Sequence, residues 1–105
     1  FPAACKRKTA NAENSLDSGA YDDAIAELTK VLTMDSSYND GKAIYLIAQA
    51  YQGKQDTENA KKYYQMYLDS YSEYRYADDA QEQLNALGGG TAADGNTGEN
   101  GTTGE

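Results

Sequence analysis

Few residues in this sequence could carry out catalysis or bind a metal ion. The chain contains no histidine and a single cysteine, Cys5. Histidine-based triads, histidine metal sites, an internal disulfide and a thiolate metal cluster are therefore excluded. The adjacent carboxylates at 22–23 and 78–79 lie at the starts of expected helices, where neighbouring side chains diverge by about 100°. They cannot hold one substrate between an acid and a base, so the sequence predicts no enzyme activity and no cofactor.

The stretch 35–41 has some of the composition of a calcium-binding loop. Asp35, Ser37 and Asn39 carry oxygen ligands at alternating positions. However, the required glycine comes one position late, and Leu46 stands where such a loop needs a glutamate. We interpret the stretch as a turn between two helices and predict no metal site.

The size and charge of the chain exclude further classes of function. With 105 residues it has room for one small domain. Nine Lys and Arg stand against 17 Asp and Glu, which makes the net charge -8. Because nucleic-acid binding needs clustered Lys and Arg on one face, this acidic balance predicts no nucleic-acid partner.

The two ends differ in composition from the middle. Residues 1–8 place a short apolar start before three consecutive cations, Lys6 to Lys8. They are interpreted as a leader or a membrane-proximal stub: the end of a removed transmembrane segment, a poor lipoprotein box or an unstructured leader. Any membrane contact is expected only through a tether upstream of Phe1. Residues 88–105 are rich in Gly, Thr and Asn and are predicted to form a disordered tail.

Residues 9–87 are predicted to form an all-α domain. Apolar residues recur there at helical spacing without any proline, and no alternating strand pattern occurs. The spacing predicts five helices, at about 9–18, 21–34, 42–52, 56–71 and 75–87. The fifth helix is polar along one side, so it is expected to face water at the end of the array.

The second and fourth helices follow the same pattern. The segment 19–24 aligns with 55–60, which is a period of about 36 residues and pairs Ala24 with Ala60. An alanine at this point allows two helices to approach closely. This repeating pair of helices resembles the tetratricopeptide repeat. The first unit matches through Leu16, Gly19, Tyr21, Ala24 and Leu28, and the second through Ala48, Tyr51, Asp56, Ala60, Tyr64 and Leu68.

The match departs from the family pattern at three positions. Ser36 and Ser72 replace the closing proline of each unit, and Ile44 replaces the tryptophan of the first helix. The resemblance implies antiparallel helix-turn-helix repeats in a short right-handed superhelix, with two units and a C-terminal capping helix.

The resemblance also implies a function: non-enzymatic binding of a peptide or protein partner on the concave face. By alignment, that face offers Thr9, Glu13, Leu16, Asp17, Tyr45, Gln49 and Gln52. The aligned positions hold no cation where many relatives hold a partner's carboxylate. We therefore expect a neutral or basic partner, anchored by stacking on Tyr45.

An alternative function is self-association. Two repeats are fewer than the three usually needed for stability, so the weakly apolar first helix could pair with another copy in a weak homo-oligomer.

A second, more restricted similarity bears on the cellular location of the chain. The segment 67–80 is similar to repeats of bacterial envelope lipoproteins, which implies an extracytoplasmic, membrane-tethered domain. The run of cations at 6–8 favours the cytoplasm instead, because cations beside a membrane segment prefer that side.

Overall fold

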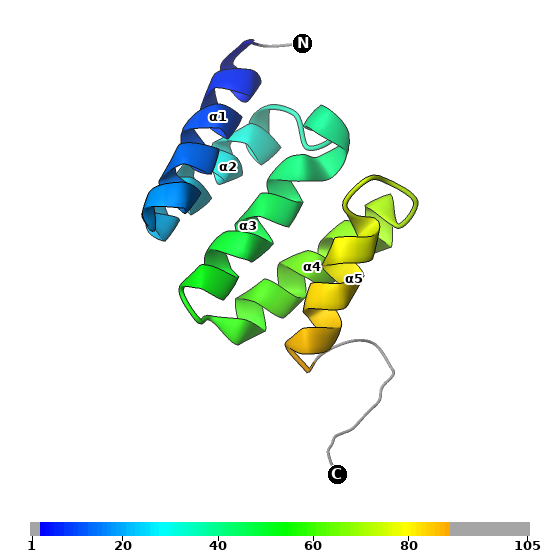
Figure 1. The fold of residues 1–105 in the computed structure, drawn as a ribbon. Helices are drawn as coiled ribbons and strands as arrows, with labels where there is room; N and C mark the ends of the chain where they lie inside the picture. The colour runs from blue at the N-terminus through cyan, green and yellow to red at the C-terminus, as the bar shows by residue number, and fades with distance from the viewer. Residues whose placement is uncertain (1–2, 89–105) are drawn as a thin grey trace.

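The computed structural model describes residues 3–88, and this range is all-α. Five α-helices and one short 3-10 turn follow in order: α1 (Ala3–Ser18), α2 (Tyr21–Met34), η1 (Tyr38–Gly41), α3 (Lys42–Gly53), α4 (Thr57–Tyr71) and α5 (Ala77–Ala86). Each helix packs mainly against the helix that precedes it and the helix that follows it. In Figure 1, α1, α3 and α5 lie in one layer, with α2 behind α1 and α4 behind α5. The all-α architecture of about five helices is confirmed.

The expected helix bounds agree with the structure to within about two residues, except at the start of α1. That helix begins at Ala3 instead of near Thr9. Cys5 explains the difference, because it lies on the same helical face as Thr9 and Ala12, and all three side chains are buried against the rest of the protein. Most of the segment interpreted as a leader or stub is thus helical. The expected tail lies outside the described residues from residue 89 onwards.

The core runs through the middle of the array and centres on α3. Every residue from Ala43 to Ala48 in this helix is buried, because α2, α4 and η1 all pack around it. Ala24 on α2 and Ala60 on α4 are fully buried, in agreement with the close helix contact that the repeat predicts. Larger core side chains on α4, Tyr64 and Tyr67, are also fully buried.

Two glycines let tyrosine rings lie directly on the backbone. A Cβ atom on Gly41 would collide with the ring of Tyr71, and one on Gly53 would collide with the ring of Tyr21. Gly41 also ends a turn in which Asn39, Asp40 and Gly41 all have left-handed backbone angles. Asn and Asp tolerate this conformation better than most residues. The stretch with calcium-loop composition is therefore a tight turn, and its Gly41 lets Tyr71 of α4 pack beside the start of α3.

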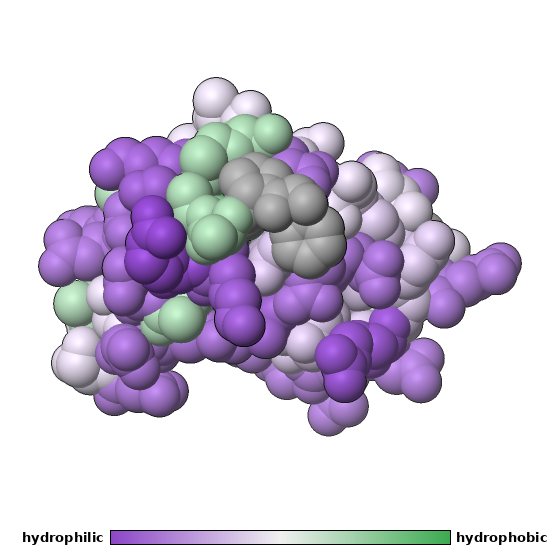
Figure 2. Space-filling view, turned by 90° about the horizontal axis from the view of Figure 1, so that it is seen from above, coloured by the Kyte–Doolittle hydropathy of each residue, from purple (hydrophilic) through white to green (hydrophobic). Residues whose placement is uncertain are grey.

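The outer side of α5 is polar, as expected for the last helix of the array. Asp78, Gln81 and Glu82 are exposed, while Ala77, Ala80 and Leu84 face the core. The side of the molecule where α1 begins is also largely hydrophilic (Figure 2). Figure 2, which looks down on this side, shows small apolar areas among mostly hydrophilic side chains.

Candidate partner-binding surface

The seven candidate residues lie on α1 and α3, in the layer that these helices form with α5 (Figure 1). The structure places them in different surroundings. Some side chains are buried, others bond to α5, and a smaller group remains accessible. Only the accessible side chains can meet a partner without rearrangement.

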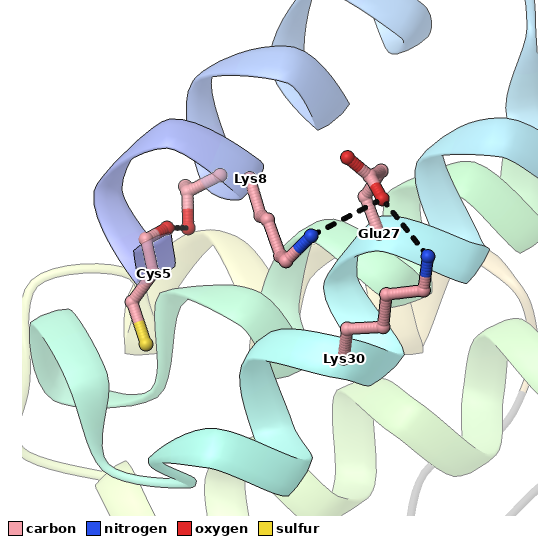
Figure 3. A network of polar contacts seen from close by, with 5 residues as sticks. Cys5, Lys8, Glu27 and Lys30 are labelled. Carbon is pink, nitrogen blue, oxygen red and sulfur yellow. Dashed lines mark hydrogen bonds and ion pairs between the residues drawn. The ribbon is translucent and has the colours of Figure 1, made fainter. Parts of the chain in front are cut away.

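Thr9 faces the interior of the protein. Its side chain is buried, and its hydroxyl donates a hydrogen bond of 2.7 Å to the carbonyl oxygen of Cys5 (Figure 3). This bond satisfies the one polar group of α1 that is buried in the contact with α2. Thr9 therefore contributes to the helix contact.

Glu13 forms an ion pair that links α1 to α3. Its Oε2 lies 2.7 Å from Nζ of Lys42, the first residue of α3. The hydrogen bond to Glu13 outweighs partial burial and raises the pKa of Lys42 above its ordinary value. Sequence alignment missed this cation, since Lys42 lies outside the positions compared. The aligned positions themselves hold no cation, but Lys42 lies close enough to neutralise Glu13.

Tyr45 is covered by other aromatic rings. The ring of Tyr76 stacks on it at a centroid distance of 4.6 Å, and Tyr64 and Tyr67 pack around it. Its hydroxyl donates a hydrogen bond to Oδ2 of Asp79 on α5. Burial raises the pKa of Tyr45 far above its ordinary value, and the neighbouring carboxylate raises it further. A partner could stack on this ring only by displacing Tyr76.

Gln52 also bonds to α5. Its Oε1 accepts a hydrogen bond of 2.6 Å from the hydroxyl of Tyr64, and its Nε2 donates one of 3.0 Å to Oε1 of Gln83. The amide of Gln83 in turn lies 3.5 Å from Oδ1 of Asp79. Burial raises the pKa of the Tyr64 phenol as well. These bonds form a continuous network across three helices, named here the α5 network: Tyr64, Gln52, Gln83, Asp79, Tyr45 and Gln49.

Besides Glu13, which is partly exposed in its ion pair, three candidate residues remain accessible. Leu16 is half-buried near the end of α1, and Asp17 beside it is exposed. Gln49 on α3 is half-buried and belongs to the edge of the α5 network, where its Nε2 donates a hydrogen bond of 3.1 Å to the hydroxyl of Tyr45. The accessible part of the predicted face is thus an apolar side chain, an amide and two carboxylates, one of them in an ion pair.

The α5 network could not be found from local spacing. Asp79 and Gln83 lie one turn apart on α5, and their polar character favoured a wholly solvent-facing helix side. Asp79 is in fact half-buried, whereas its neighbour Asp78 is exposed. The only sequence signal was the occurrence of Gln49 and Gln52 on one side of α3.

Between residues 3 and 88, no three Cys, Asp or Glu side chains come together as a metal site. In the same range, no helix is long and apolar enough to cross a membrane. Comparison of the chain with known protein families, with curated proteins and with solved structures finds no match.

Proposed function

We propose that this chain is a non-enzymatic protein-interaction module of the tetratricopeptide type, which binds a peptide or protein partner on the layer of α1, α3 and α5. Its repeating helix pairs, with Ala24 and Ala60 at equivalent contacts, support the family assignment. The observation that carries the proposal is that α1 and α3 together form one side of the layer. The Glu13–Lys42 ion pair joins the two helices, with Leu16, Asp17 and Gln49 accessible on them.

The partner is proposed to be neutral or basic. Lys42 is held by Glu13, and its side chain is only 19% exposed, so it is a poor site for an incoming carboxylate. Asp17 is exposed and forms no ion pair within residues 3–88. A basic side chain of the partner can pair with Asp17, while Gln49 can exchange hydrogen bonds with a backbone amide.

The residue proposed to anchor the partner is Leu16 in place of Tyr45. Tyr45 and Gln52 are committed to α5, so binding there requires α5 to move. Leu16 is a half-buried apolar side chain that a partner can cover at once. The surface proposed for the partner is therefore the α1–α3 side of the layer: Glu13, Leu16, Asp17, Lys42 and Gln49.

The alternative, self-association, would use the outer face of α1. The exposed residues there are alanine or polar: Ala3, Lys6, Arg7, Ala10, Asn11 and Asn14. Such a face offers little apolar area to a second copy. Light scattering across micromolar to millimolar concentration distinguishes the two functions, because the interaction module is expected to stay monomeric. We also propose that the domain is tethered to the outside of a bacterial membrane, because the segment 67–80 is similar to repeats of bacterial envelope lipoproteins.

A chemical-shift titration tests the binding surface. Two peptides of equal length and apolar content, one basic and one acidic, are added to the labelled protein. The basic peptide should shift the amides around Leu16, Asp17 and Gln49. Asp17→Asn should weaken its binding, while the control Asp23→Asn, an exposed carboxylate on α2, should not. Preferential binding of the acidic peptide, or shifts confined to α2 and α4, would contradict the proposal.

A further inference from the structure

Cations gather at one end of this acidic protein. Because α1 and α2 are antiparallel, the start of α1 lies beside the end of α2 (Figure 1). In Figure 3, Glu27 lies between Lys8 of α1 and Lys30 of α2, with nitrogen–oxygen distances of 4.0 Å and 3.5 Å. The same region contains further exposed residues, and the whole set is named here the basic end: Ala3, Lys6, Arg7, Lys8, Lys30 and Met34.

The cations of α1 are placed where they oppose helix formation. The start of a helix carries partial positive charge and favours acidic side chains. The first turns of α2, α4 and α5 follow this rule with acidic residues, whereas those of α1 and α3 have none, and only that of α1 leads directly into three consecutive cations, Lys6, Arg7 and Lys8. A local rule broken at a cost to stability is expected where the residues serve a function.

The charge of the basic end is largely uncompensated by the protein itself. Lys6 and Arg7 are exposed and form no ion pair within residues 3–88. Glu27 neutralises only part of the charge of Lys8 and Lys30. The whole chain nevertheless carries a net charge of -8, so its other surfaces are strongly acidic. Charge is therefore divided between a basic end and an acidic body.

Apolar side chains lie among these cations. Met34 ends α2 with 41% of its surface exposed, and Ala3 is exposed at the start of α1. Figure 2 shows a small apolar area on this side of the molecule, with hydrophilic side chains close to it. Long cations around a small apolar centre are suited to a lipid headgroup layer, where the cations meet phosphates and the apolar groups reach the acyl boundary.

We propose that the basic end docks on the surface of a lipid bilayer that contains anionic lipids. Lys6, Arg7 and Lys30 pair with the headgroup phosphates, and Met34 enters the interface. The acidic body is repelled from the same surface, so the protein is oriented with α1 towards the membrane. Carboxylates more than about 8 Å from the surface are screened at physiological salt and do not cancel the attraction.

The expected binding is weak and depends on charge. Each Lys or Arg near an anionic surface strengthens partition by about fivefold. Loss of both Lys6 and Arg7 should thus weaken it by about thirtyfold. The double variant Lys6→Gln/Arg7→Gln makes this change at exposed positions. The matched control is Lys61→Gln/Lys62→Gln on α4, which removes the same charge far along the chain from the basic end.

The test is flotation of the full chain with vesicles at low salt and at ~0.15 M salt. One set of vesicles contains phosphatidylcholine alone, and the other contains one third phosphatidylglycerol. We expect the protein to float only with the anionic vesicles, more at low salt. The Lys6→Gln/Arg7→Gln variant should remain unbound, and the Lys61→Gln/Lys62→Gln control should float like the original protein. Circular dichroism of both variants verifies that they are folded.

Three results would overturn the proposal. The first is no flotation of the original protein with anionic vesicles at low salt. The second is an equal loss of binding in both variants, which would show dependence on net charge alone. The third is tighter binding to soluble polyglutamate than to the anionic vesicles, which would assign the basic end to an acidic macromolecule in solution.

Discussion

The two ends of the helix array are held to the core in different ways. The buried part of the contact between α1 and α2 consists mainly of small and aliphatic side chains, among them Cys5, Ala12 and Leu28, and the Lys8–Glu27 ion pair lies outside it. The contact of α5 also buries small residues, Ala77 and Ala80, but most of its specific contacts are polar or aromatic. The α5 network and the stacked rings of Tyr45 and Tyr76 connect it to α3.

This difference shows how one repeating backbone pattern can be stabilised by unlike interactions. Packing of small side chains depends on volume, so it should respond to size and not to polarity. Hydrogen bonds between partly buried side chains depend on direction, so removal of a single oxygen atom should matter. The following predictions test this contrast, from the largest effect to the smallest.

High pH should destabilise the α5 half most. The phenols of Tyr45 and Tyr64 have a raised pKa in the folded protein, whereas in the unfolded chain they ionise near 10. Their contribution to stability is complete below that pH and is lost as the pH rises above it. Tyrosinate absorbance should therefore appear in two steps, the second coinciding with the loss of helical circular dichroism. A single early step, complete while the helices persist, would contradict the burial of these rings.

Tyr67→Ala should lower the free energy of unfolding by about 3–5 kcal/mol, since it removes a large buried side chain. Tyr67 is fully buried and contacts the rings of Tyr45, Tyr71 and Tyr76. Denaturant unfolding measures the loss. Tyr74→Ala is the control, because that side chain is 49% exposed and should cost about 0.5 kcal/mol or less. Equal effects of the two substitutions would refute the assigned core.

Ala24→Leu and Ala60→Leu should each cost about 1–3 kcal/mol by overpacking. Both alanines are fully buried at equivalent helix contacts, one in each half of the array, so their effects should be similar. Thermal or denaturant unfolding gives the values. Ala26→Leu, at an exposed position of α2, should be nearly neutral. A silent Ala60→Leu would mean that the repeat is aligned in the wrong register.

Tyr45→Phe should cost about 1–2 kcal/mol, because Asp79 loses its hydrogen-bond donor while it remains half-buried. Tyr63→Phe is the matched control, since Tyr63 is half-buried and its hydroxyl makes no hydrogen bond within residues 3–88. The difference in unfolding free energy isolates the contribution of the Tyr45 hydroxyl. No difference between the two variants would show that the α5 network adds no stability.

Glu13→Gln should have the smallest effect, about 0.2–1 kcal/mol, because its ion pair with Lys42 is only partly buried. High salt should reduce the difference between the variant and the original protein. Unfolding at low and high salt measures both values. A loss that is independent of salt would indicate that Glu13 acts through packing instead of charge.

Local periodicity predicted the helices well and the contacts between distant helices poorly. The apolar stripe that contains Ala24 and Leu28 correctly predicted α2. Asp56 caps α4, as its residue type predicts, by accepting a hydrogen bond from the backbone N–H of Asn59. A hydrogen bond from the side-chain amide of Asn59, together with this backbone bond, lowers the pKa of Asp56. The start of α1 was missed because one buried residue, Cys5, extends its stripe through a cationic segment.

The candidate surface was predicted only in part. Leu16, Asp17 and Gln49 are accessible, but Lys42 was missed and Tyr45 is covered. Both differences arise because the relevant contacts join α3 to α1 or to α5, and the relative placement of helices is not encoded in the spacing within any one of them.

Native-state hydrogen exchange tests the contrast between the two ends most directly. Exchange is measured residue by residue on the original protein and on Tyr45→Phe, with Tyr63→Phe as the control. We predict that Tyr45→Phe speeds exchange of the α5 amides about tenfold and leaves those of α1 and α2 nearly unchanged, because only α5 depends on the lost hydroxyl. Equal acceleration throughout α1 to α5, or unchanged exchange in α5, would contradict the conclusion that the two ends are held differently.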